Sequence, residues 1–89
     1  MIRATYFVSG RVQGVGFRYT TQETAKKFDV QGTVENLEDE RVKIVVEGES
    51  QEIDRFILAV RASMSGQIKH IDRFESAPSR EFENFTVRR

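Results

Sequence analysis

The sequence of 89 residues predicts an α+β fold in which two helices cover one face of an antiparallel sheet. Two segments have the apolar periodicity of amphipathic helices, and the segments around them have the alternation or the β-branched composition of strands. The composition, 38% hydrophobic with seven Phe, is enough for one modest core. We therefore expect one continuous domain over residues 1–89.

A strand, a glycine-rich loop and a helix are expected at the start of the chain. Residues 3–9 alternate in character, as in a strand with one buried face. The apolar side chains that share one face of this strand are Ile2, Ala4, Tyr6 and Val8. Apolar and small residues then recur at helical spacing from Phe17 to about Phe28, which predicts an amphipathic helix.

An antiparallel hairpin is expected next. Residues 30–34 begin a second strand, and residues 42–47 (VKIVVE) form a third that is rich in β-branched side chains. The segment between these strands, residues 38–41, is short and polar. A connection of this length favours direct pairing of the two strands.

A second helix follows the hairpin. Apolar residues recur at helical spacing from Ile53 to Met64. Ser50 is the expected N-cap of this helix, and Gly66 is its expected C-terminal stop.

Two strands are expected after the second helix. Residues 68–76 have strand character, residues 77–79 (APS) break it, and residues 82–88 form a short closing strand. The order is therefore β-α-β-β-α-β with a short final strand. Two helices on one face of an antiparallel sheet in this order form the ferredoxin-like split β-α-β arrangement.

The loop GRVQGVGFR joins the first strand to the first helix and is the strongest candidate for a site. Glycines such as Gly14 and Gly16 can adopt positive φ, so that successive backbone N–H groups point inward and bind an anion. The start of the helix adds its positive dipole end, and the guanidinium of Arg18 can hold two oxygens at once. The loop matches neither a Walker A sequence nor a dinucleotide-binding fingerprint. From these residues alone, a tight strand-to-helix turn with a solvated Arg18 is the alternative to a phosphate or carboxylate site.

The loop GRVQGVGFR resembles the first signature of the acylphosphatase family, and residues 32–37 (GTVENL) resemble the second. The resemblance extends over nearly the whole chain, including its length, the order of its elements and the closing residues 85–87. It implies a hydrolase that cleaves the carboxyl-phosphate anhydride of small acyl phosphates to a carboxylate and inorganic phosphate. It also implies that no metal, no cofactor and no covalent enzyme intermediate takes part.

The resemblance implies a role for each residue of the site. The phosphate-binding residues would be Gln13, Gly14, Val15, Gly16, Phe17 and Arg18. The backbone amides of these residues would surround the phosphoryl oxygens, the guanidinium of Arg18 would hold the phosphate, and the side chain of Asn36 would orient the attacking water. Such a sparse site suits phosphoryl transfer, in which positioning and preorganised donors supply most of the catalysis. Without the resemblance, Asn36 would be interpreted as a residue that caps the following turn.

One position departs from the family pattern. The hairpin after Asn36 usually closes on Asp-Gly or Asn-Gly in this family, whereas this chain has Asp39-Glu40. A non-glycine residue at positive φ costs on the order of 1 kcal/mol. We therefore expect either a different turn geometry or a hairpin that tolerates this cost.

The distribution of charge and the composition argue against other classes of function. Formal charge cancels at 14 against 14, but residues 1–30 hold five positive and two negative charges, whereas residues 31–55 hold three and eight. This distribution favours a small anionic ligand near the N-terminal end over a nucleic acid. There is no cysteine, and a single histidine cannot form a metal site, so none is predicted; this histidine, His70, is expected to be a surface or half-buried strand residue.

The remaining expectations concern partners and location. No apolar leader or membrane-length apolar run is present, so we expect a cytoplasmic, monomeric enzyme without a membrane or nucleic-acid partner. The alternatives are a non-catalytic ferredoxin-like module that binds an anionic metabolite or a partner protein, and an RNA-binding sheet. The last would need exposed aromatic residues on the central strands and a basic-aromatic signature, and VKIVVEG has neither. The physiological acyl group is not evident from the sequence, and the resemblance implies broad activity.

Overall fold

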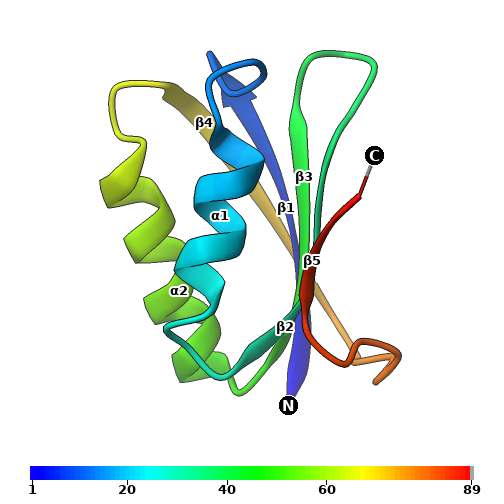
Figure 1. Ribbon diagram of the computed structural model, residues 1–89. Helices are drawn as coiled ribbons and strands as arrows, with labels where there is room; N and C mark the ends of the chain where they lie inside the picture. The colour runs from blue at the N-terminus through cyan, green and yellow to red at the C-terminus, as the bar shows by residue number, and fades with distance from the viewer. Residues whose placement is uncertain (89) are drawn as a thin grey trace.

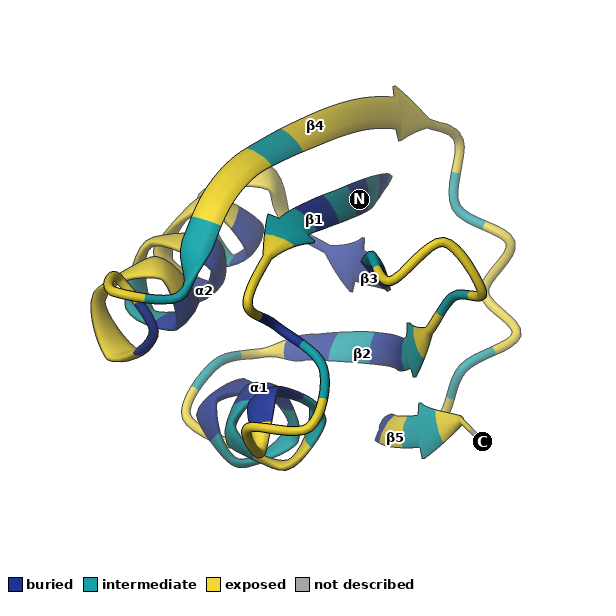
Figure 2. Cartoon of the chain, turned by 90° about the horizontal axis from the view of Figure 1, so that it is seen from above, coloured by how far each residue is buried: buried dark blue, intermediate teal, exposed yellow. Residues whose placement is uncertain are grey.

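The computed structural model describes residues 1–88 as a five-stranded sheet with two helices packed on one face (Figure 1). The elements are β1 (Ile2–Gly10), α1 (Phe17–Ala25), β2 (Val30–Asn36), β3 (Val42–Gly48), α2 (Ser50–Ser63), β4 (Ile68–Ser76) and β5 (Phe85–Arg88). The strand order is β4-β1-β3-β2-β5, and Figure 2 shows both helices on the same side of this row of strands. The predicted fold class is confirmed. Within residues 1–88, neither helix is long and apolar enough to cross a membrane.

The direction of the last strand differs from the prediction. The first four strands pair antiparallel with their neighbours, but β5 pairs parallel with β2, with Gly32 opposite Phe85 and Glu35 opposite Arg88. The expectation of a wholly antiparallel sheet is therefore wrong at this edge. Residues 77–84 carry the chain from one edge of the sheet to the other and reverse its direction, so β5 runs opposite to β4 and along β2. The strand also begins at Phe85 rather than at residue 82.

The core lies between the sheet and the helices. The predicted inner face of β1 is confirmed, because Ala4, Tyr6 and Val8 are buried. From α2, the fully buried side chain of Phe56 lies at the centre, with the ring of Phe85 at 5.5 Å between centroids. This contact joins the helix layer to the last strand and so helps to hold β5 in place.

The observed ends of the helices differ from the predicted ends at three points. Helix α1 ends at Ala25 rather than near Phe28, because the N–H of Phe28 bonds the carbonyl of Ala25 three residues back and tightens the last turn. Helix α2 begins at Ser50, with Glu49 as its N-cap and no side-chain capping bond, so the assignment of Ser50 as the N-cap is wrong. That helix ends at Ser63, before the glycine predicted to stop it.

The open face of the sheet carries an aromatic pair that the sequence analysis overlooked. The rings of Phe7 and Phe74 meet edge to face with centroids 5.8 Å apart, and Phe74 is 60% exposed. The guanidinium of Arg41 lies 4.7 Å from the centroid of the Phe7 ring. The open face therefore does carry one exposed aromatic side chain, Phe74 of β4, beside the half-buried Phe7 of β1.

The turn of the β2–β3 hairpin contains a residue other than glycine in the left-handed backbone conformation. Glu40 has φ of 73°, and its N–H bonds the carbonyl of Leu37 at 3.3 Å. The turn thus keeps a conformation suited to glycine and accepts the steric cost of a side chain.

Replacing this residue with glycine is expected to stabilise the protein. Glu40→Gly should raise the free energy of unfolding by about 0.5–1 kcal/mol, because relief of the left-handed strain exceeds the added entropy of the unfolded chain. Urea unfolding of both proteins measures the change. Glu38→Gly is the matched control, since Glu38 is in the same turn without positive φ and should lose stability. Equal effects of the two substitutions would contradict the strain at Glu40.

A buried carboxylate anchors the connection between β4 and β5. Glu47 of β3 is 2% exposed, and its carboxylate accepts bonds from the N–H of Ser79 (2.8 Å), the N–H of Arg80 (2.9 Å) and Nε of Arg3 (2.8 Å). Burial alone would raise the pKa of Glu47, but these hydrogen bonds outweigh it and lower the pKa from 4.5 to about 2. The folded state therefore favours the ionised carboxylate.

This anchor predicts a loss of stability in acid. Because the pKa of Glu47 is lower in the folded state, its stabilisation is complete above pH 4.5 and disappears as pH falls toward about 2. The loss should be about 2–3 kcal/mol. Urea unfolding at several pH values should show a smaller drop across this window for Glu47→Gln than for the unmodified protein. Parallel pH profiles for the two proteins would contradict this role.

Candidate active site

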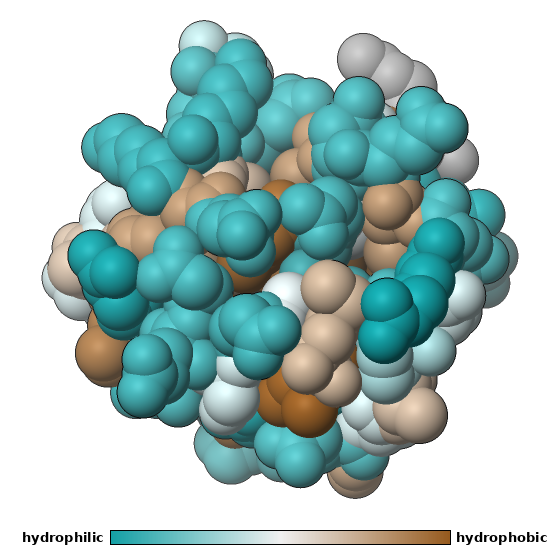
Figure 3. Space-filling model, turned by 90° about the horizontal axis from the view of Figure 1, so that it is seen from below, coloured by the Kyte–Doolittle hydropathy of each residue, from teal (hydrophilic) through white to brown (hydrophobic). Residues whose placement is uncertain are grey.

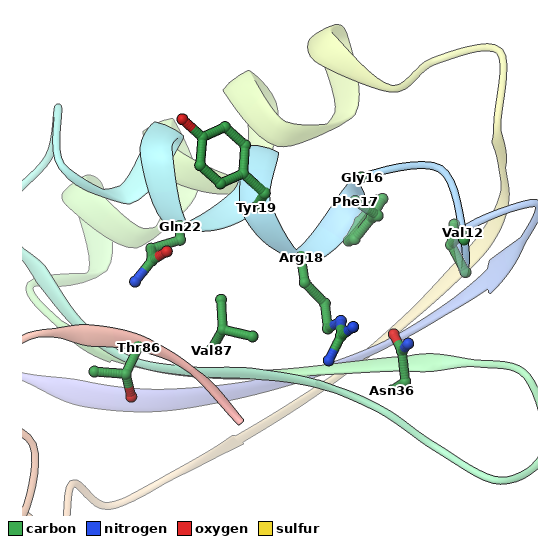
Figure 4. A pocket seen from close by; sticks show the side chains of 10 residues that line it. Val12, Gly16, Phe17, Arg18, Tyr19, Gln22, Asn36, Thr86 and Val87 are labelled. Carbon is green, nitrogen blue, oxygen red and sulfur yellow. The ribbon is translucent and has the colours of Figure 1, made fainter. Parts of the chain in front are cut away.

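A cavity of about 490 Å³ opens where the glycine loop, α1, the end of β2 and β5 meet. It is lined by Val12, Gly14, Gly16, Phe17, Arg18, Tyr19, Gln22, Asn36, Thr86 and Val87. The structure thus brings together the two predicted catalytic residues, Arg18 from α1 and Asn36 from β2. Figure 4 shows the guanidinium of Arg18 and the amide of Asn36 directed toward each other across the cavity.

The two glycines nearest the helix have the conformation that the predicted loop requires. Gly14 has φ of 75° and Gly16 has φ of 80°, and a Cβ at either position would meet no atom within 4 Å. Backbone conformation rather than space therefore requires glycine there. Gly10 differs, because a Cβ there would lie 2.2 Å from the carbonyl oxygen of Gln67, so its role is close packing against the start of β4.

The loop presents backbone donors without protein acceptors. In the part of the chain that the structure describes, the N–H groups of residues 13–18 donate to no backbone or side-chain oxygen. The first backbone bond of α1 runs from the N–H of Thr20 to the carbonyl of Gly16 at 3.0 Å. The unpaired donors therefore coincide with the positive end of the helix dipole, as expected of an anion site.

Among residues 1–88, Arg18 is the one charged residue that lines the cavity. Its side chain is half-buried, and Nη1 donates a long bond of 3.4 Å to the carbonyl oxygen of Arg88 in β5. No carboxylate of residues 1–88 forms an ion pair with it. The positive charge is therefore held near the loop by a neutral acceptor and remains available to an anion.

Asn36 is the last residue of β2 and is exposed to the cavity. The alternative role, capping the following turn, belongs to Asp39, whose carboxylate accepts the N–H of Arg41 at 3.2 Å and pairs with its Nε at 2.7 Å. The backbone N–H and the guanidinium of Arg41 lower the pKa of Asp39. The amide of Asn36 makes no hydrogen bond to another described residue, so both its donor and its acceptor are free.

Gln13 has a part in the site that sequence reasoning missed. Its side-chain nitrogen donates to the carbonyl oxygens of Leu37 at 2.8 Å and Arg41 at 2.9 Å. These carbonyls flank the β2–β3 turn, and the first follows Asn36 directly. One amide therefore sets the distance between the glycine loop and the candidate catalytic asparagine. The sequence predicted a role only for the backbone of Gln13, because the contact spans 24 residues and leaves no local pattern.

Five lining residues were also absent from the sequence prediction: Val12, Tyr19, Gln22, Thr86 and Val87. Gln22 lies one turn beyond Arg18 on α1, and Thr86 and Val87 come from β5. The side-chain nitrogen of Gln22 donates to the carbonyl oxygen of Phe85 at 3.4 Å. The parallel pairing of β5 with β2 brings Thr86 and Val87 to the cavity, and no signal in the local sequence indicates that pairing.

Metal-ligating residues do not gather at this site. Among residues 1–88, no group of three or more His, Cys, Asp or Glu side chains is arranged to hold a metal ion. His70 is exposed on β4, as predicted, and its Nε2 lies 2.8 Å from a carboxylate oxygen of Asp72. Besides the backbone amides, the polar groups of the described lining are the guanidinium of Arg18, the carboxamides of Asn36 and Gln22, and the hydroxyls of Tyr19 and Thr86.

Comparison with known proteins gives one consistent family. The acylphosphatase family model matches residues 4–87. An acylphosphatase from Listeria monocytogenes is 42% identical over 82 residues, covering 90% of this chain and 88% of the relative. One from Lactobacillus gasseri is 40% identical over 89 residues, covering 98% of both chains. The crystal structure of acylphosphatase from Bacillus subtilis superposes with a TM-score of 0.89 at 33% identity and covers all of both chains.

Proposed function

Since this chain belongs to the acylphosphatase family and is an enzyme of that kind, we propose that it hydrolyses acyl phosphates in the cavity between α1, β2 and β5. The substrates are small molecules with a phosphate joined to a carboxyl group. The observation that carries the proposal is the convergence of Arg18, Asn36 and the unpaired loop amides on one cavity. A non-catalytic anion-binding module would need the loop and Arg18 but would have no use for an unbonded carboxamide beside them.

In the proposed complex, the phosphoryl group occupies the glycine loop. The backbone N–H groups of residues 13–18 donate to its oxygens, and Arg18 donates from the opposite side. The transferring phosphoryl group spreads negative charge over its equatorial oxygens in a loose transition state. Donors that are fixed before the reaction stabilise this charge without reorganisation, so the loop and Arg18 lower the barrier as well as bind the substrate.

Asn36 is proposed to orient the attacking water. A carboxamide accepts one hydrogen bond and donates another, so it can direct the water oxygen toward phosphorus without removing a proton. The water oxygen forms the new bond to phosphorus, and the bond from phosphorus to the acyl oxygen breaks, leaving its electron pair on the carboxylate. We propose that a phosphate oxygen of the substrate takes the proton from the water. The carboxylate is a good leaving group, so no strong general acid is required.

Hydrolysis of benzoyl phosphate in H₂¹⁸O with EDTA present tests this function. The expected result is turnover that resists EDTA and places the label in inorganic phosphate, since the water attacks phosphorus. Label in benzoate would mean attack at the carbonyl carbon and would overturn the proposed arrangement. Loss of turnover in EDTA, restored by a divalent cation, would overturn the metal-free mechanism.

We further propose that residues 1–89 act as one monomeric domain in the cytoplasm, without a membrane or nucleic-acid partner. The lack of an overall basic charge argues against a nucleic-acid partner, and the absence of cysteine fits a reducing cytoplasm. Figure 3 shows the end of the molecule away from the glycine loop, where hydrophilic side chains predominate and apolar ones occupy small separate areas. Such a surface favours the monomer at that end. Light scattering coupled to gel filtration measures the mass.

A further inference from the structure

One side chain joins the glycine loop to the β2–β3 turn. The two segments lie at the same end of the molecule (Figure 1). The side-chain nitrogen of Gln13 donates to the carbonyl oxygen of Leu37 at 2.8 Å and to that of Arg41 at 2.9 Å. Within residues 1–88, no other hydrogen bond connects residues 11–16 with residues 37–41. The hydrogen bonding that relates the loop to the turn therefore depends on a single carboxamide.

The two acceptors are the carbonyls that close the turn. The carbonyl oxygen of Arg41 also accepts the N–H of Leu37 at 2.8 Å, and that of Leu37 accepts the N–H of Glu40 at 3.3 Å. Each carbonyl oxygen has two lone pairs, so the bonds from Gln13 are added to the bonds of the turn and replace none of them. The ladder between β2 and β3 also forms without Gln13. Its side chain therefore determines where the turn lies rather than whether the turn forms.

On the other side of this contact, Gln13 stands at the start of the flexible part of the loop. The side chains of Val12 and Phe17 are each 1% exposed and anchor the two ends of this part. Between them, Gly14 and Gly16 have positive φ and leave the backbone with wide conformational freedom. Gln13 is the one residue of this stretch with a polar side chain, so it alone can fasten the stretch to another element by a side-chain hydrogen bond.

The turn side of the contact bears directly on Asn36. Leu37 follows Asn36 in the chain, and the amide of Asn36 makes no hydrogen bond that would fix it independently. The place of this amide relative to a phosphoryl group in the loop thus follows from the backbone that Gln13 holds. A displacement of about 1 Å between reacting groups can cost about 10²-fold in rate, so this distance matters for attack by water.

We propose that Gln13 is a positioning residue for hydrolysis, whose side chain holds the end of β2 at the distance from the glycine loop that places the water of Asn36 in line with the phosphoryl group. This inference rests on the proposed function. The side chain of Gln13 makes no contact with the substrate in this arrangement and acts through Asn36. Its loss should therefore affect the chemical step and leave phosphate binding to the loop amides and Arg18.

The first test replaces the carboxamide with an apolar side chain of similar length. Gln13→Met should lower kcat for benzoyl phosphate by about 10- to 30-fold, while inhibition by inorganic phosphate stays within about twofold of its original strength. Gln51→Met is the matched control, because Gln51 is exposed on α2 and does not line the cavity. Its kcat should equal that of the unmodified protein.

A double-mutant cycle with Asn36→Ala tests whether Gln13 acts through Asn36. Once the amide of Asn36 is absent, its position no longer matters, so Gln13→Met should lower kcat by less than about twofold in the Asn36→Ala protein. A purely structural role would give the opposite result, because partial unfolding lowers the rate by the same factor in both backgrounds. Urea unfolding of all four proteins measures the folded fraction.

A second substitution keeps the cycle informative if Gln13→Met does not fold. Gln13→Asn keeps a polar carboxamide but is one methylene group shorter, so the nitrogen cannot reach both carbonyl oxygens from the same backbone position. The expected pattern is the same: a lower kcat with retained phosphate inhibition, and little further loss in the Asn36→Ala protein.

The outcomes separate this inference from the function on which it rests. Losses of kcat that multiply in the double variant would overturn the positioning role and leave the catalytic site intact. Phosphate inhibition that weakens in proportion to kcat would also overturn it, since Gln13 would then serve phosphate binding. Absence of turnover by the unmodified protein would overturn the catalytic proposal itself, and the positioning role with it.

Discussion

Arg18→Ala is expected to lower kcat/KM for benzoyl phosphate by about 10³-fold, with most of the loss in substrate binding. The substitution removes the positive charge that Arg18 places in the lining of the cavity and leaves the loop amides in place. Inorganic phosphate, which would occupy the same donors, should lose affinity as an inhibitor in parallel with the rise in KM. Initial rates over a range of substrate and phosphate concentrations measure both quantities.

Arg11→Ala is the matched control for the charge. Arg11 is exposed beside the same loop, but it does not line the cavity. Loss of its side chain should change kcat/KM less than about twofold, because an exposed charge at a distance is screened. Similar losses of kcat/KM in Arg11→Ala and Arg18→Ala would show that catalysis depends on the overall positive charge of this region rather than on the position of Arg18. Retained phosphate inhibition in Arg18→Ala would contradict the proposed contact.

Asn36→Ala is expected to lower kcat by about 10²- to 10³-fold while inhibition by inorganic phosphate remains within about twofold of its original strength. The amide orients the water in this proposal and leaves phosphate binding to the loop and Arg18. The turn beyond it should persist, because Asp39 caps that turn. Measured kcat and the inhibition constant of phosphate therefore separate the roles of Asn36 and Arg18.

Asn84→Ala provides the control for removal of an exposed asparagine side chain. Asn84 lies outside the cavity, and its backbone carbonyl accepts the N–H of Gly32 at 3.0 Å, a bond that the substitution keeps. Its kcat should match that of the unmodified protein. A loss of phosphate inhibition in Asn36→Ala, in proportion to the loss of kcat, would move Asn36 from orienting water to binding phosphate.

The elements of this fold could be predicted from the sequence because their patterns are local. Alternation over residues 3–9 and the helical spacing from Ile53 to Met64 each reflect one buried face, whereas the β-branched run at residues 42–47 reflects a central strand that is buried along most of its length. The glycine loop was also recognisable, since positive φ at Gly14 and Gly16 leaves a residue-type signal. Local conformation and one-sided burial are the properties that a single sequence encodes most directly.

The features that the sequence did not indicate depend on contacts between distant segments. The parallel direction of β5 follows from how the chain crosses the sheet, and the contact between Gln13 and Leu37 follows from how the loop meets the hairpin. Glu47 resembles an ordinary polar residue of a strand, and only the approach of Ser79 and Arg80 makes it a buried anchor. The early end of α1 likewise follows from the tight turn that precedes β2.

The late position of β5 in the chain has a consequence for how the protein folds. The bond from Arg18 to Arg88 spans 70 residues, and the pairing of β1 with β4 is also long-range, so the topology has high contact order. Closing such long loops lowers the conformational entropy of the chain before the stabilising contacts form. Chains of this kind therefore fold slowly for their size. The side of the cavity that Thr86 and Val87 line depends on the pairing of β5 with β2, so the strand, loop and helix at the start of the chain cannot form the complete cavity by themselves.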